Sequence, residues 1–125
     1  MSRFALDTSA WIEYFSKGSD EVNELISNEE IYTSVISIAE IADIFLRNHR
    51  ESKEVLRFIK EKSEIVNVDF DISIMAAKIK NTVIEKNKKF GLADAIHLAC
   101  SKKVDAVFIT KDNDFRGLDR VRMLK

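Results

Sequence analysis

Short apolar segments that alternate with longer amphipathic segments constrain the fold of this chain more than any other sequence feature. The clearest are residues 4–6 and 106–109, which read FAL and AVFI and show no alternation of polar and apolar side chains. Strands of this kind are buried on both faces, which is typical of parallel sheets that carry helices on each side. The pattern therefore predicts an α/β fold: a three-layer α/β/α domain around a central, mostly parallel sheet of four to five strands.

The expected elements follow one another along the chain as strands and helices. Strands are predicted from short apolar runs at residues 3–7, 30–34, 64–69, 106–109 and 121–125. Helices are predicted from apolar residues at helical spacing over residues 8–17, 19–28, 34–49, 51–62, 70–89 and 91–103. Gly18 is expected to end the first helix, and residues 112–115 are expected to form a turn or a helical stub.

Composition narrows the class of protein. With 125 residues, no proline and only three glycines, the chain is expected to form one domain over residues 1–125 without a linker. A net charge of −1 gives no general attraction to nucleic acid, so any such contact must come from a local patch or a metal ion. The single cysteine excludes an internal disulfide, and no segment approaches the roughly 18 apolar residues of a membrane span. We therefore expect a cytoplasmic protein.

Four acidic residues occupy positions where such a fold would bring them together. Asp7 closes the first strand, and Asp112 comes shortly after the strand at residues 106–109. Glu40 and Asp94 lie early in two helices and stand among apolar residues. Ligands of open α/β sheets bind beyond the carboxyl ends of the strands, so all four side chains are expected at one edge of the sheet.

A metal ion offers an explanation for acids in apolar surroundings, where an isolated carboxylate is costly or becomes protonated. Lys111 is the only basic residue next to any of the four acids, so ion pairing is the weaker explanation. Oxygen ligands suit Mg²⁺ or Mn²⁺, whereas Cys100, His49 and His97 lack the spacing of zinc ligands. Such a site is suited to phosphodiester hydrolysis by a metal-activated water. The predicted metal ligands and catalytic residues are Asp7, Glu40, Asp94 and Asp112.

Each acid also has a purely structural interpretation. Asp7 can cap the following helix instead of binding an ion, although the next two residues can cap it equally well. Glu40 can form a buried salt bridge. Asp94 can simply stabilise its helix, because a negative charge near the N-terminus interacts favourably with the helix dipole. Asp112 and Asp114 can be turn residues. The joint pattern of the four acids is harder to obtain by chance than any single member of it.

Four motifs in order resemble those of the PIN-domain family, and in particular the VapC-type toxins of toxin–antitoxin pairs. They read LDTSAWI, SVISIAEIAD, GLADAIHLACS and VFITKDNDF at residues 6–12, 34–43, 91–101 and 107–115. The resemblance assigns one metal-binding acid to each motif, and these are Asp7, Glu40, Asp94 and Asp112. Asp114 is the alternative for the last acid, and Ser9 matches a small hydroxyl residue that supports the site in the family.

The same resemblance implies a PIN-like fold and a Mg²⁺- or Mn²⁺-dependent endoribonuclease. It also implies a homodimer, RNA as the substrate and inhibition by a small cognate antitoxin protein. Two other functions remain open. One is a catalytically inactive PIN-like module that binds RNA or protein, and the other is a phospho-accepting signalling domain, which also places acids at strand ends.

Residues around these motifs carry further expectations. His97 is expected to be a packed, hydrogen-bonded residue rather than a catalytic base, and Asp43 a solvated or salt-bridged acid. The lysine-rich tract at residues 78–89 is interpreted as a solvated helix end, with contact to RNA phosphates as the alternative. A groove between the helices at residues 8–17 and 34–49 is expected to bind the partner protein.

Overall fold

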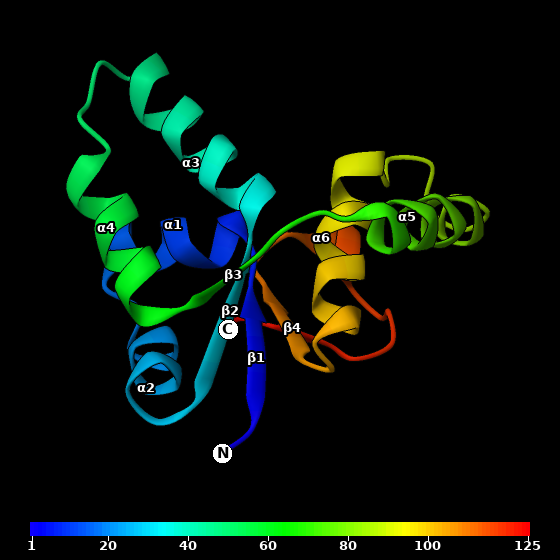
Figure 1. The fold of residues 1–125 in the computed structure, drawn as a ribbon, viewed down its shortest axis with the longest axis horizontal. Helices are drawn as coiled ribbons and strands as arrows, with labels where there is room; N and C mark the ends of the chain where they lie inside the picture. Colours follow the sequence, from blue (N-terminus) through cyan, green and yellow to red (C-terminus); the bar gives the residue numbers. More distant parts are fainter.

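A five-stranded sheet runs through the centre of the molecule, with helices on both of its faces (Figure 1). The computed structural model describes all residues from 1 to 125. The strands are β1 (Arg3–Leu6), β2 (Glu30–Ser34), β3 (Glu64–Val66), β4 (Val107–Thr110) and β5 (Val121–Met123). The helices are α1 (Thr8–Lys17), α2 (Asp20–Asn28), α3 (Val35–Arg47), α4 (Lys53–Lys62), α5 (Phe70–Val83), α6 (Leu92–Lys103) and the 3₁₀ helix η1 (Asn113–Phe115). The predicted fold class is confirmed, because five strands are present and every neighbouring pair is parallel.

The strand order determines where a ligand can bind. The order across the sheet is β3-β2-β1-β4-β5, so the direction of strand addition reverses between β1 and β4. These two strands pair with Leu6 opposite Ile109, and the amide of Asp7 donates to the carbonyl of Ile109 at 3.1 Å. Ligand sites of open parallel sheets lie at such a reversal. The order also differs from the 2-1-3-4-5 order of phospho-accepting signalling domains, which argues against that interpretation.

Both faces of the sheet are buried, as the apolar strands predicted. Adjacent residues of β1 point to opposite sides, so Ala5 packs with α5 and α6 whereas Leu6 packs with α1, α2, α3 and α4. The same alternation in β4 sends Phe108 to the first side and Ile109 to the second. Figure 1 shows this division, with α5 and α6 on one side of the sheet and α1, α2 and α4 on the other. Trp11 is fully buried in the second core.

Helix ends follow the sequence in most places, with one error. Gly18 adopts a left-handed conformation, φ 63°, and ends α1 as predicted. The helix predicted for residues 70–89 is wrong in its length, because α5 stops at Val83 and residues 84–90 form turns. Asn87 explains this difference: its side chain accepts from the amide of Lys89 and donates to the carbonyl of Asp114, contacts that a continuing helix would not allow. No helix combines the length and the apolar character needed to cross a membrane.

Candidate active site

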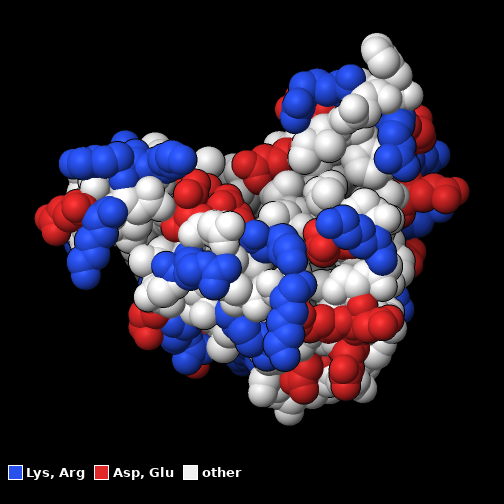
Figure 2. Space-filling model, turned by 180° about the vertical axis from the view of Figure 1, so that it is seen from behind, with Lys and Arg blue, Asp and Glu red and all other residues white.

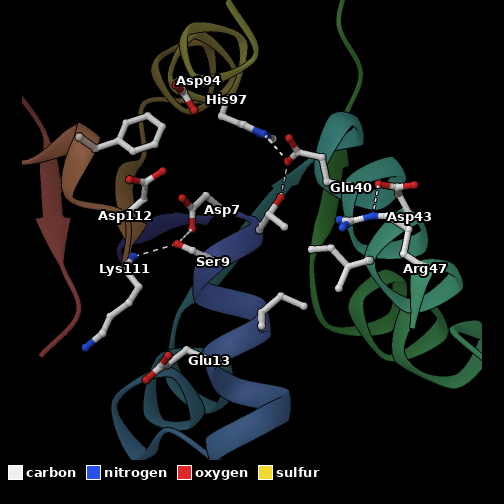
Figure 3. A pocket seen from close by; sticks show the side chains of 14 residues that line it. Asp7, Ser9, Glu13, Glu40, Asp43, Arg47, Asp94, His97, Lys111 and Asp112 are labelled. Atoms are coloured by element: carbon white, nitrogen blue, oxygen red, sulfur yellow. Dashed lines mark hydrogen bonds and ion pairs between the residues drawn. The ribbon is translucent and has the colours of Figure 1, made fainter. Parts of the chain in front are cut away.

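A pocket of about 600 Å³ opens at the carboxyl edge of the sheet, where β1 and β4 end (Figure 3). Its walls come from the start of α1, the middle of α3, the start of α6 and the turn after β4. All four acids selected from the sequence line it: Asp7, Glu40, Asp94 and Asp112. Asp114 does not line the pocket, so the structure favours Asp112 as the fourth acid of this site.

Asp7 is the most enclosed of the four acids, with 5% of its surface exposed. It is the N-cap of α1, since its Oδ1 accepts from the amide of Ala10 at 2.9 Å and from the hydroxyl of Ser9 at 2.7 Å. Its Oδ2 accepts from the hydroxyl of Thr110 at 2.6 Å. Burial raises the pKa of Asp7 above its ordinary value, although these hydrogen bonds act in the opposite direction. Burial therefore destabilises the ionised form of Asp7, and a bound cation would stabilise it.

Two hydroxyl groups fix the ends of β1 and β4 around Asp7. The fully buried Thr110 lies 3.2 Å from the hydroxyl of Ser9 and accepts from the amide of Asp112 at 3.0 Å. Ser9 in turn accepts from the amide of Lys111 at 2.9 Å. These hydrogen bonds connect the carboxylate of Asp7 to the backbone of the turn after β4.

Glu40 is held from two sides through one of its oxygens. Its Oε1 accepts from the hydroxyl of Thr8 at 2.5 Å and from Nε2 of His97 at 2.8 Å. Because an ionised carboxylate can only accept, Nε2 carries the proton in this pair, and the hydrogen bond lowers the pKa of Glu40. Nδ1 of His97 faces the hydroxyl of Ser37 at 3.5 Å. Oε2 of Glu40 makes no such bond, so it remains available to the pocket (Figure 3).

Asp94 and Asp112 each bind a backbone amide at the start of a helix. Oδ2 of Asp94 accepts from the amide of Gly91 at 2.8 Å, and Oδ1 of Asp112 accepts from the amide of Asp114 at 2.9 Å. Burial raises the pKa of Asp94, and the negative charges of Asp112 and Asp114 raise it further. Asp94 and Asp112 therefore do stabilise the backbone at the starts of helical segments, and the same two residues also line the pocket.

Positive charge in the pocket is directed away from the acids. Arg47 lines the rim but forms an ion pair with Asp43 at 3.0 Å, which confirms the expectation of a salt-bridged Asp43. Lys111 also lines the rim, yet its ammonium group binds the carbonyl of Lys125 at 2.9 Å and points away from the acids (Figure 3). None of Asp7, Asp94 and Asp112 forms an ion pair with Lys or Arg.

The donors of this pocket suit a hard divalent cation by their chemistry. They are carboxylate and hydroxyl oxygens, the ligands that Mg²⁺ and Mn²⁺ prefer, and their negative charge has no cationic partner among the lysines and arginines. As the side chains stand, no three His, Cys, Asp or Glu residues are close enough together to hold an ion. The residues thus share a pocket and a donor chemistry, without forming a ready-made ligand cluster.

Several residues of the site were not identified from the sequence. Thr8 and Thr110 bind Glu40 and Asp7, and Glu13 lines the rim of the pocket. The partners of the two threonines lie 32 and 103 residues away, so no local pattern reveals these contacts. The only available signal was that Thr110 stands at a strand end, two residues before an acid. His97 behaves as predicted, since it is buried and hydrogen-bonded to Glu40.

Comparison with known proteins agrees with this description of the fold. A toxin–antitoxin complex from Klebsiella pneumoniae is 25% identical, with a TM-score of 0.74 and coverage of 98% of this chain and 96% of that chain. VapBC2 from Rickettsia felis, bound to a fragment of promoter DNA, is 16% identical with a TM-score of 0.79 over 98% and 97% of the two chains. Mycobacterium tuberculosis VapC20, described as a sarcin–ricin loop cleaving toxin, is 18% identical with a TM-score of 0.67 over 95% and 98%. No curated relative matches the sequence.

The sequence itself matches the model of the PIN domain over residues 4–121. That range covers β1 from its second residue, β2, β3, β4, all six α-helices and the four acids of the pocket, and it ends at the first residue of β5. Because the match extends over nearly the whole chain, and the parallel sheet and its acid-lined edge were found independently of it, this chain belongs to the PIN-domain family.

Proposed function

We propose that this protein is a metal-dependent endoribonuclease and the toxin of a type II toxin–antitoxin pair. The observation that carries the proposal is the convergence of acids from four separate segments on one pocket: Asp7, Glu40, Asp94 and Asp112. The pocket lies at the strand-order reversal, where parallel sheets bind their ligands. Membership of the PIN family and the likeness to toxin structures support the choice of RNA as substrate.

The residues of this chain would position both the ion and the RNA. Asp7, Glu40, Asp94 and Asp112 would hold one or two Mg²⁺ or Mn²⁺ ions, which supply polarisation of the phosphoryl group and activation of a water. Ser9 and Thr110 fix the orientation of Asp7, and Thr8 with His97 fixes that of Glu40. Without the cation, the acids would repel an anionic RNA, so the charge of the site makes binding conditional on metal.

A small antitoxin protein and a second copy of the chain are the proposed protein partners. A cavity of about 200 Å³ between α1 and α3 is lined by apolar side chains including Ile12, Phe15 and Ile44, and it lies where the partner groove was predicted. It shares Ile12 and Ile44 with the rim of the active-site pocket, so an antitoxin bound there would sit beside the acids. For the homodimer, Phe70 on α5 offers exposed apolar surface, with 80% of its area accessible.

Cleavage of a labelled structured RNA tests the proposed activity. The wild type is expected to cut in Mn²⁺ or Mg²⁺ and to stop in EDTA, with activity returning when the metal is added back. Asp7→Asn, purified in parallel, should be inactive while remaining folded. Asn has the same shape and keeps the oxygen that accepts from Ala10 and Ser9, and its NH2 group can donate to the Thr110 hydroxyl, but it lacks the charge. Cleavage that persists in EDTA or in Asp7→Asn would point to a contaminating nuclease or another chemistry and would contradict the proposal.

A catalytically inactive module that binds RNA or protein is the alternative function. The observation in its favour is that no three ligating side chains are grouped for an ion as they stand. This alternative predicts RNA or protein binding without turnover in any divalent metal. RNA binding that is equal in EDTA and in Mn²⁺, with no cleavage in either, would favour it over the nuclease.

A further inference from the structure

The segment from Ile84 to Phe90, called the basic loop below, concentrates positive charge beside the site. It contains Lys86, Lys88 and Lys89, all exposed, and Glu85 as its only acid. None of the three lysines forms an ion pair with any acid of the chain. Three unpaired ammonium groups in a stretch of four residues therefore remain free for an external anion.

Two contacts fix the basic loop to the wall of the active site. The side-chain amide of Asn87 donates to the carbonyl of Asp114 at 3.3 Å and accepts from the amide of Lys89 at 3.0 Å. The buried ring of Phe90 packs edge-on against Phe115, with 5.4 Å between the ring centres, and Phe115 lines the pocket. The loop is thus held against the turn that carries Asp112, and its position is tied to that of the pocket.

The end of the basic loop also leads directly to one of the acids. Gly91 follows the loop, and its amide binds the carboxylate of Asp94. Lys89 is two residues before Gly91, which places its Cα at most about 8 Å from the Cα of Gly91. Lys89 is therefore close along the chain to the amide that binds Asp94, at the start of α6.

An RNA strand in the acidic pocket needs positively charged groups outside the pocket to bind its neighbouring phosphates. Figure 2 shows Asp and Glu atoms gathered in a hollow between two lobes, with Lys and Arg atoms on the lobes at either side. A bound metal can offset the acids near the reacting phosphate, but neighbouring phosphates of a strand lie beyond it. The rim cations Arg47 and Lys111 already bind Asp43 and Lys125, whereas the three lysines of the basic loop form no ion pair.

We propose that the basic loop is a phosphate-binding site for the RNA strand, on the α6 side of the active site. It binds the backbone phosphates next to the one that is cut, so it sets the affinity and the path of the strand but not the sequence that is read. This inference rests on the proposed ribonuclease function. For these lysines it favours contact with RNA phosphates over a solvated helix end, the two interpretations that the sequence leaves open.

The test replaces the three lysines and compares a matched variant on another surface. The loop variant is Lys86→Gln/Lys88→Gln/Lys89→Gln. The control is Lys53→Gln/Arg57→Gln/Lys60→Gln on α4, which removes the same charge from residues that line a different pocket and form no ion pairs. Binding of a labelled structured RNA is measured in Mn²⁺ on an Asp7→Asn background that leaves the RNA intact, and cleavage is measured without that substitution.

The loop variant is expected to bind RNA about tenfold more weakly, and its slope of log Kd against log salt should fall by about 2, for three lost phosphate contacts. KM should rise by a similar factor while kcat stays within about twofold, and Lys→Arg at the three positions should restore binding. The control variant should bind like the wild type. Equal binding by the wild type and the loop variant, or equal losses in the loop and control variants, would overturn the inference.

The same measurements separate this inference from the proposed function. A wild type that cuts RNA, with a loop variant that binds and cuts equally well, removes the role of the loop and leaves the nuclease intact. A wild type that binds RNA through the loop but never cuts it removes the nuclease and leaves the phosphate-binding site. Absence of RNA binding by the wild type overturns both.

Discussion

At the scale of single residues, the acids of the pocket have structural and functional positions at once. Asp7, Asp94 and Asp112 each accept a backbone amide at the start of a helical segment. In a parallel sheet, the helix that follows a strand begins at the carboxyl edge, so its capping residues collect there. The backbone amide fixes one oxygen of Asp94 and one of Asp112, whereas both oxygens of Asp7 are bound, the second by the hydroxyl of Thr110.

His97 provides a residue-scale prediction, since it holds Glu40 through a 2.8 Å hydrogen bond. His97→Ala should raise the Mn²⁺ concentration needed for half-maximal cleavage by about 10–100-fold, because Glu40 loses the group that orients it. The pKa of Glu40 should also rise without this bond, so the acidic limb of the pH–rate profile should move to higher pH. Metal titrations of cleavage at several pH values measure both effects.

A matched histidine and a conservative replacement separate this role from general damage. His97→Gln retains an N–H donor and should recover part of the metal affinity. His49→Asn changes the other histidine, which is exposed and has a positive φ that Asn tolerates, and should behave like the wild type. An unchanged metal requirement in folded His97→Ala would rule out a positioning role for His97.

At the scale of elements, backbone conformation decides which glycines are required. Gly18 ends α1 at φ 63°, a conformation that is costly for residues with a Cβ. Gly91 precedes α6 at φ −97°, which any residue adopts, and a Cβ there would meet Oδ2 of Asp94 at an ordinary 3.6 Å. Two glycines at helix ends therefore differ in their need for glycine.

The corresponding prediction compares two alanine variants. Gly18→Ala should lower the free energy of unfolding by about 1 kcal/mol, because alanine strains the left-handed turn that ends α1. Gly91→Ala should leave stability unchanged or slightly raised. Denaturant unfolding of both variants in EDTA tests this, and equal losses in the two would show that the conformation of Gly18 is not the determining factor.

At the scale of the whole molecule, the buried acid that would bind the metal also lowers the stability of the metal-free protein. Burial raises the pKa of Asp7, so the folded metal-free protein binds a proton more tightly than the unfolded chain does. The contribution of Asp7 to stability should therefore fall as the pH rises above 3.8, the ordinary pKa of an aspartate. A bound divalent cation would reverse this loss, since it binds only the folded site.

We accordingly predict that Asp7→Asn stabilises the metal-free protein while it abolishes cleavage. The melting temperature of the variant in EDTA should exceed that of the wild type at pH 7.5, because the variant lacks the buried charge. Each 1 kcal/mol of added stability corresponds to about 3–5 °C for a chain of this size. The difference should shrink as the pH falls towards the ordinary pKa of an aspartate, because Asp7 of the wild type then binds a proton.

Adding Mn²⁺ should raise the melting temperature of the wild type. At a free Mn²⁺ concentration of one hundred times Kd, the free energy of unfolding should increase by about 2.7 kcal/mol. The same addition should stabilise Asp7→Asn less, because one of the four acids of the pocket has lost its charge. Thermal unfolding over a series of pH values, with and without Mn²⁺, measures both parts. A wild type that is more stable than the variant in EDTA at pH 7.5 would show that burial of the Asp7 charge does not govern stability.

The sequence by itself determined the elements and their class. The pattern of apolar residues predicted four to five strands, six helices and a mostly parallel sheet, because burial on both faces leaves a local pattern in each strand. It also marked Asp94 and Glu40, since an acid within an apolar run stands out without any knowledge of its neighbours. Gly18 was predicted from its residue type alone, because few residues adopt its backbone conformation at low cost.

Only the tertiary structure decided which side chains meet. The pairs Thr8–Glu40, Glu40–His97 and Asp7–Thr110 join residues 32, 57 and 103 positions apart. They depend on the register between β1 and β4 and on the strand order, and neither of these appears in a local pattern. The early end of α5 has the same origin, because Asn87 leaves the helix to bind the turn beside the pocket. Local periodicity reports burial, whereas the chemistry of the site arises from contacts that exist only once the sheet has formed.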